Sequence, residues 1–274
     1  MVVLKLTSHH KTRKGKSGAK RKLSTICAVL AVVTIIGLLY LSFPQNEHSP
    51  VRGGVAIVDS FYSSTPNFTN EAVRFLSSKE VRVDVYRDEN VTVELYRELP
   101  TYGYSLIILR VHAGSGEDSP SPTFLFTNEP YVNDKYPVER ANKQILKGVI
   151  DLNNPVNPVF SVGPLFVDRS MKGNFDNSTV ILSSCYGLYN DWLADAFIER
   201  GAKAFIGWDG KVTLEHTDAA SLALLEALIN QNLTVSDAVT KVMKEVGPDT
   251  ACGSKLEYYP NEAEDATVNL TSSS

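Results

Sequence analysis

The sequence predicts an α/β protein in which a mostly parallel sheet lies between two layers of helices. Short apolar runs rich in β-branched residues, typical of strands that are buried on both faces, recur at residues 54–60, 104–111, 179–183 and 204–208. Segments with apolar residues at helical spacing separate these runs. Because strands that alternate with helices form parallel sheets through right-handed crossovers, the pattern favours a three-layer α/β/α architecture.

Residues 179–208 form the clearest strand–helix–strand unit. The apolar run that opens it predicts a strand, and Gly187 lets the chain turn after that strand. Apolar side chains then recur at helical spacing from Trp192 to Phe197, with acidic residues on another face. Gly201 is suited to end this helix, and the next strand is expected at residues 204–208.

The segments before this unit continue the alternation. We expect strands at residues 54–60, 81–86 and 104–111. Helices are expected between them at residues 70–77, where Asn70 can act as the N-cap, and at residues 93–99. The stretch 117–175 is rich in Asn and Pro, and we expect strands at 123–127 and 159–167 and a helical tendency after Pro137.

The segments after the unit predict two more helices and one strand. Apolar periodicity indicates helices at residues 218–230 and 235–246, the second closed by Gly247 and Pro248. Residues 255–259 are expected to form a final edge strand. The acidic, Ser/Thr-rich stretch 261–274 predicts disorder.

The N-terminus differs in kind from the rest of the chain. Residues 1–22 contain eight Lys and Arg residues and no acidic residue, and residues 23–43 contain no charge. A helix of that length spans about 31 Å, the thickness of a hydrocarbon core. Positive charge before a membrane span keeps the preceding segment in the cytoplasm. We therefore expect a single-pass plasma-membrane signal-anchor with a cytoplasmic N-terminus. A cleaved signal peptide is the alternative, but no small-residue cleavage motif follows the span.

The remainder of the chain is then expected outside the cytoplasm, as a linker (44–53) and an α/β domain (54–260). Residues 44–274 carry 19 Lys and Arg against 31 Asp and Glu, a net charge of −12. This charge argues against nucleic acid as a partner. The lipid bilayer is expected to be contacted through residues 23–43. Five N-x-S/T motifs provide candidate glycosylation sites at Asn67, Asn90, Asn177, Asn232 and Asn269.

Two chemically reactive residues follow predicted strands. His112 comes after the run 104–111, and Cys185 comes after the run 179–183. The carboxyl ends of parallel strands share one edge of a sheet, which is where α/β proteins bind their ligands. A neighbouring imidazole can convert a thiol into the thiolate nucleophile. Gly114 and Gly187, each two residues after one of these side chains, would let backbone N–H groups approach an oxyanion.

These motifs resemble those of the caspase-like cysteine peptidases, a group that includes caspases, gingipains, separases and CHAT domains. The resemblance lies in the order strand–His–x–Gly, strand–small–Cys–x–Gly, helix, Gly-Ala and strand, and covers residues 54–246. It implies a peptidase acting on peptide or protein substrates, with His112 as the base and Cys185 as the nucleophile. Two features differ from the family: Ser183 and Ser184 precede the cysteine, and Ala113 separates His112 from Gly114.

The residues leave other interpretations open. Cys185 can instead form a disulfide with Cys252, the other cysteine outside the predicted membrane segment, in a non-catalytic domain that binds a ligand or partner. Asp209 and Asp59 also follow predicted strands and can contact substrate or simply form turns, and His216 favours a structural role.

No cofactor or metal site is expected, because the nucleotide-binding glycine motifs, the HExxH metal motif and the GxSxG elbow are absent from the sequence. The acidic net charge of the domain mildly favours a basic residue in the substrate.

Overall fold

The computed structural model describes residues 53–116, 121–150 and 156–270. The predicted membrane segment 23–43 therefore lies outside the described residues, as does the basic stretch that precedes it. Of the helices that the structure describes, none has the length and apolar character needed to cross a bilayer.

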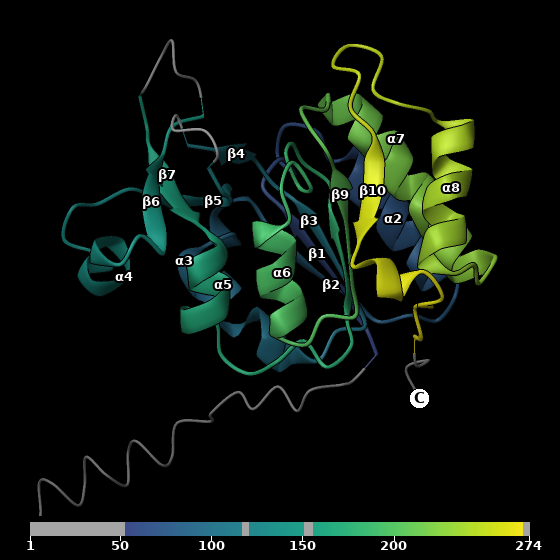
Figure 1. The fold of residues 1–274 in the computed structure, drawn as a ribbon, viewed down its shortest axis with the longest axis horizontal. Helices are drawn as coiled ribbons and strands as arrows, with labels where there is room; N and C mark the ends of the chain where they lie inside the picture. The colour runs from purple at the N-terminus through teal and green to yellow at the C-terminus, as the bar shows by residue number, and fades with distance from the viewer. Residues whose placement is uncertain (1–52, 117–120, 151–155, 271–274) are drawn as a thin grey trace, which may run out of the picture. The chain divides into compact units, whose positions relative to one another are not determined.

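A six-stranded sheet forms the centre of the fold, in the order β10-β9-β8-β3-β1-β2 (Figure 1). Five strands are parallel, and only the edge strand β10 is antiparallel to its neighbour. The mostly parallel sheet predicted from the sequence is confirmed. The strands are β1 (Val55–Asp59), β2 (Val83–Arg87), β3 (Leu106–Arg110), β8 (Thr179–Leu182), β9 (Ala204–Trp208) and β10 (Leu256–Tyr259).

Helices cover both faces of this sheet, so the described residues form three layers (Figure 1). One face packs against α3 (Val93–Glu98), α5 (Pro164–Ser170) and α6 (Trp192–Glu199). The other packs against α2 (Asn67–Ser77), α7 (Leu214–Leu225) and α8 (Val235–Glu245). Each strand contributes alternate residues to the two hydrophobic clusters, as the period-2 geometry of a strand requires.

A second, antiparallel sheet is inserted between β3 and β8, in the order β4-β5-β7-β6. Its strands are β4 (Ala113–Ser115), β5 (Thr123–Pro130), β6 (Ile145–Gly148) and β7 (Val159–Val162), and α4 (Pro137–Ala141) lies between β5 and β6. The strand expected at residues 159–167 is wrong beyond Val162. Pro164 begins α5 there, because proline at the first helical position has a suitable φ and no N–H to satisfy.

Two predicted helix starts are also too late in the sequence. Asn70 does not cap α2, which begins at Asn67 after Pro66; the Asn70 N–H donates to the Pro66 carbonyl instead. The helix expected from residue 218 begins at Leu214 and continues as the π-helix η3 (Glu226–Asn230). Three short 3-10 turns, η1 (Asp88–Asn90), η2 (Leu99–Tyr102) and η4 (Asn261–Ala263), complete the described elements.

The stretch predicted to be disordered, residues 261–274, instead packs on the fold as far as residue 270. Ala263, Ala266 and Val268 are buried in the cluster beneath α8. The Val235 N–H donates to the Ala266 carbonyl at 2.7 Å, so this stretch also holds the start of α8. Three apolar residues among acidic neighbours are enough to anchor the segment. The prediction of disorder was based on the average composition of the stretch, which these three residues change little.

Substituting Val268→Ala should therefore lower the free energy of unfolding by about 1–3 kcal/mol, because two buried methyl groups are lost and a cavity remains. Urea denaturation of the full chain measures this. Asp265→Ala, at an exposed position of the same segment, serves as the control and should stay within about 0.5 kcal/mol of wild type. Equal stability of the Val268 variant and wild type would show that the segment does not contribute to the core.

Candidate active site

The two reactive residues of the sequence follow neighbouring strands. β3 and β8 pair in parallel, with Leu109 opposite Leu182. His112 and Cys185 each lie three residues beyond this pair, at the same edge of the sheet. The Ser183 N–H donates to the Leu109 carbonyl at 3.0 Å, so the pairing extends past the last strand residue. Because neighbouring strands lie about 4.8 Å apart, the register brings the two residues to one region of the fold.

The His112 ring lies in an apolar environment. It makes an edge contact with Phe61, with ring centroids 4.5 Å apart, and faces Phe126 at 6.5 Å. Its carbonyl accepts the Phe126 N–H at 2.8 Å, which ties it to the second sheet. Burial lowers the pKa of His112 below its ordinary value of 6.5. The imidazole is therefore neutral at pH 7 and able to accept a proton.

A groove opens beside His112, with a cavity volume of about 490 Å³. Backbone and side chains of β4 and β6 line it, together with Phe124 and Phe126 of β5. Tyr186 and Lys211 close it on the side of the main sheet. The groove thus lies where the central sheet meets the antiparallel one, and it is large enough for several side chains of a peptide.

Cys185 is not part of the lining of this groove. The side chain is half-buried, and Sγ lies 3.5 Å from both the nitrogen and the carbonyl oxygen of Val212. The residues next to these two, Tyr186 and Lys211, do line the groove. Tyr186 has a φ of 62°, an uncommon left-handed conformation for a bulky residue, which marks a sharp turn directly after the cysteine.

The three weaker site candidates have different positions. Gly114 lies on β4 and lines the groove. Gly187 is buried against β9, where a Cβ would come within 3.1 Å of the Gly207 Cα, so close backbone packing accounts for this glycine. Asp209 is occupied in joining β10 to β9, because its carboxylate accepts the Lys255 N–H at 2.8 Å.

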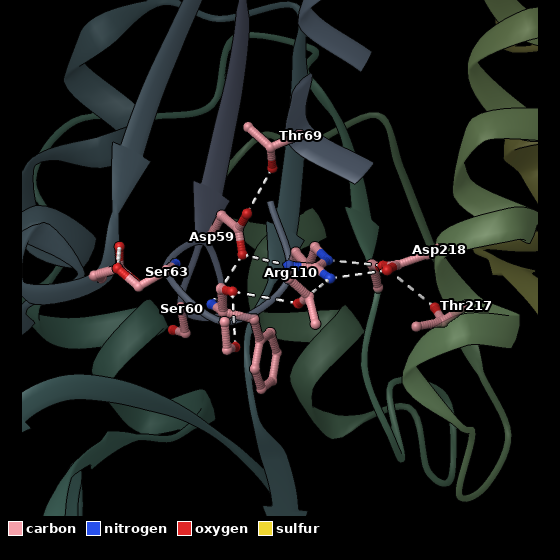
Figure 2. A network of polar contacts seen from close by, with 12 residues as sticks. Asp59, Ser60, Ser63, Thr69, Arg110, Thr217 and Asp218 are labelled. Atoms are coloured by element: carbon pink, nitrogen blue, oxygen red, sulfur yellow. Dashed lines mark hydrogen bonds and ion pairs between the residues drawn. The ribbon is translucent and has the colours of Figure 1, made fainter. Parts of the chain in front are cut away.

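A buried ion network that the sequence analysis missed lies at the ends of β1 and β3 (Figure 2). Arg110 and Asp59 are fully buried, and the guanidinium donates to Asp59 at 2.7 Å and, through two nitrogens, to Asp218 at 2.7 and 2.8 Å. The strand order reverses between β1 and β3, which is the point where doubly wound sheets bind ligands. The sequence feature that could have indicated this network is an arginine inside the apolar run 104–111.

The same network reaches His112 through Phe61. The Phe61 N–H donates to Asp59 at 2.9 Å, and the Arg110 guanidinium carbon lies 5.3 Å from the Phe61 ring centroid. Arg110 also donates to the Thr65 hydroxyl, and the Thr65 N–H donates to the Phe61 carbonyl at 2.8 Å. The loop 60–65 is therefore held so that Phe61 covers the imidazole.

Other candidate residues have structural partners. His216 Nε2 lies 3.0 Å from the Gly247 carbonyl, and its ring packs edge-on against Trp208. Both Cys185 and Cys252 are free thiols. Local desolvation, and next the Asp249 carboxylate, raise the pKa of Cys252, so this thiol stays protonated at neutral pH. Within residues 53–116, 121–150 and 156–270, no group of three or more His, Cys, Asp or Glu side chains is arranged to hold a metal ion.

No protein-family model matches this chain, and no curated protein matches it.

Replacing Arg110 by Met should lower the free energy of unfolding by about 3–5 kcal/mol, because Asp59 is then left buried without its counter-ion. Urea denaturation measures the loss. The double variant Arg110→Met/Asp59→Asn should recover part of it, since it removes the isolated charge. Arg169→Met is the control: its side chain is 57% exposed and pairs with exposed Asp168, so the change should be under about 1 kcal/mol. Wild-type stability of the Arg110 variant would contradict this role of the network.

The His112 imidazole should titrate below pH 6.5 in the folded chain, which NMR of the ring resonances measures. Since the unfolded state takes up the proton first as the pH falls through 6.5, this histidine destabilises the fold in acid. Phe61→Ala should move the titration midpoint up toward 6.5, because water then reaches the ring. Phe75→Ala, at a half-buried position of α2, should leave the midpoint unchanged. An unshifted midpoint in the Phe61 variant would rule out shielding by that ring.

Proposed function

We propose that this chain is a membrane-anchored extracytoplasmic cysteine peptidase of the caspase-like type, with His112 as the general base and Cys185 as the nucleophile. The observation that carries the proposal is the parallel pairing of β3 and β8, which brings both residues to one sheet edge in equivalent register. The groove beside His112 supports it, because a peptide needs an accessible cleft next to the reacting groups.

In the proposed reaction, neutral His112 takes the proton of the Cys185 thiol. The thiolate attacks the carbonyl carbon of a peptide bond, and the amine leaves with the proton held by the imidazole. Water then hydrolyses the acyl-enzyme, with His112 again accepting a proton. Since Sγ contacts Val212, the thiol has to turn from that contact toward the groove, a change within the range seen between free and substrate-bound enzymes.

Of the three weaker site candidates, one belongs to the proposal. Gly114 lines the groove, so the backbone around it is proposed to contact the carbonyl oxygen of the substrate. Gly187 and Asp209 are engaged in packing and strand pairing, and we assign them no contact with substrate.

The location proposed for the domain rests on the sequence. A basic stretch (1–22) precedes an uncharged span (23–43), and we propose that this span anchors the chain in the plasma membrane with its N-terminus in the cytoplasm. The five candidate glycosylation asparagines, at positions 67, 90, 177, 232 and 269, are all exposed. Their accessibility suits an extracytoplasmic domain, and their modification stays a prediction.

A non-catalytic binding domain with a Cys185–Cys252 disulfide is the second candidate. One set of contacts favours it: Asp249 accepts the N–H groups of both Cys252 and Thr213, and so holds the Cys252 segment beside the one that Cys185 contacts. Val212, the residue before Thr213, contacts the Cys185 sulfur. An oxidised pair would occupy the sulfur that catalysis needs.

A thiol-reactive peptide probe, such as a peptidyl acyloxymethyl ketone, should label the reduced full chain at Cys185. Cys185→Ala should abolish labelling, and His112→Ala should slow it by about 10²–10⁴-fold through loss of the base. Cys252→Ala is the matched control and should be labelled at the wild-type rate.

Equal labelling of wild type and the Cys185 variant would contradict the peptidase proposal. Mass mapping of the native chain without reductant addresses the second candidate. A Cys185–Cys252 crosslink in the protein as isolated would favour the binding domain.

A further inference from the structure

The groove beside His112 lies on one face of the second sheet. Strand residues alternate between the two faces, and Leu125 of β5, Ile145 of β6 and Val162 of β7 are buried in the hydrophobic cluster on the other face. The alternate positions of these strands and of β4 line the groove, namely Gly114, Phe124, Phe126, Leu146, Gly148 and Ser161. Except for Ser161, the side chains on this face of the sheet are apolar or absent.

The ring of Phe126 is the centre of this face. Glycines stand where the two outer strands approach it: a Cβ on Gly148 of β6 would lie 3.4 Å from the Phe126 Cζ, and a Cβ on Gly114 of β4 would lie 3.9 Å from the same atom. The two strands are opposite edges of the sheet, so the sheet curls around this one ring. Because neither glycine places a side chain over the ring, Phe126 is only half-buried and borders the groove.

Three further rings line the same groove. Phe124 lies two residues before Phe126 on the same face, and the His112 ring centroid is 6.5 Å from that of Phe126. Tyr186 closes the groove on the side of the main sheet. Aromatic pairs gain free energy beyond the area that they bury, in tilted and edge geometries as well as in offset stacks. A ligand ring therefore suits this groove better than an aliphatic side chain of similar size.

This aromatic lining is fixed to the segments that carry both reactive residues. The Phe126 N–H donates to the His112 carbonyl at 2.8 Å. The Thr123 hydroxyl, at the start of β5, donates at 2.7 Å to the carbonyl of Tyr186, the residue after Cys185. β5 thus joins the segment after β3 to the turn after β8. A side chain that contacts Phe126 would bring the backbone of its own peptide next to His112.

We propose that the groove binds an aromatic side chain of a peptide, with Phe126 as the residue that determines this specificity. The inference rests on the proposed function and adds a substrate class to it. A basic side chain, which the net charge of the domain mildly favours, is the competing ligand. The net charge acts at long range and is screened over about 8–10 Å, whereas the ring of Phe126 acts at contact distance.

Binding without cleavage tests the proposal. The full chain, purified with Cys185→Ala, is titrated with end-blocked peptides Ala-Ala-Xaa-Ala-Ala in which Xaa is Phe, Leu, Ala or Lys, and calorimetry measures each Kd. The Phe peptide should bind at least about tenfold more tightly than the Ala peptide, because its ring is removed from water. It should bind about fivefold more tightly than the Leu peptide, because of the ring contacts.

The substitution Phe126→Leu keeps an apolar side chain and removes the ring. It should bring the ratio of the Leu and Phe Kd values close to one, and change the Kd of the Leu peptide by less than about twofold. Phe75→Leu is the matched control, since it makes the same change at a half-buried position of α2 in the other hydrophobic cluster, and it should keep the ratio.

A second measurement needs no substitution in the groove. With the Cys185→Ala chain, nuclear Overhauser effects should connect the ring protons of the bound Phe peptide to the rings of Phe126 and His112. Effects to other parts of the chain alone would overturn the inference. So would tightest binding of the Leu or Lys peptide, an unchanged ratio in the Phe126 variant, or no binding of any peptide.

These results are independent of catalysis. If the probe fails to label Cys185 but the preference that depends on Phe126 is found, the peptidase proposal is lost and the aromatic site stands. If labelling succeeds and the preference is absent, only the aromatic specificity is lost.

Discussion

The ion network around Arg110 is the constraint on which the rest of the site depends. A fully buried guanidinium is costly to desolvate, and Asp59 and Asp218 compensate it with three charge-assisted hydrogen bonds (Figure 2). Because such networks rarely add stability over an apolar core of the same volume, the effect that matters here is geometric. The network fixes β1, β3, the loop 60–65 and the first turns of α7 relative to one another, and through Phe61 it sets the environment of His112.

The fold could be predicted from the sequence wherever burial imposes a pattern. β1, β3, β8 and β9 are covered on both faces, so their apolar runs identify them, and α6 and α8 present one apolar stripe each. Prediction failed where tertiary contacts override local pattern. The inserted sheet pairs β4 with β5 and β7 with β6, and no pattern in residues 117–175 alone reveals those partners. The packed stretch 261–270 was missed because only three of its residues are buried in the core.

The candidate site shows the same division. The positions of His112 and Cys185 at strand ends could be predicted, since the carboxyl ends of parallel strands share one edge. Their side-chain surroundings could not. The role of Arg110 could not be predicted, because its partners Asp59 and Asp218 are distant in the sequence and only the fold brings them together.

The first turns of α7 hold the strand ends beside the two reactive residues. Asp218 holds the end of β3, and the Thr217 hydroxyl contacts both Ser183 after β8 and the Trp208 ring nitrogen of β9, each at 3.0 Å. Three adjacent strand ends are thereby fixed to one helix, so the backbone on either side of His112 and Cys185 is not free to shift. The Cys185 side chain packs against the cluster under α2, α7 and α8, and its sulfur lies 3.5 Å from the nitrogen and the carbonyl oxygen of Val212. In the proposed peptidase, a χ1 rotation between staggered rotamers would have to displace these contacts to bring the sulfur to the groove, and such a rotation costs far less than a backbone movement.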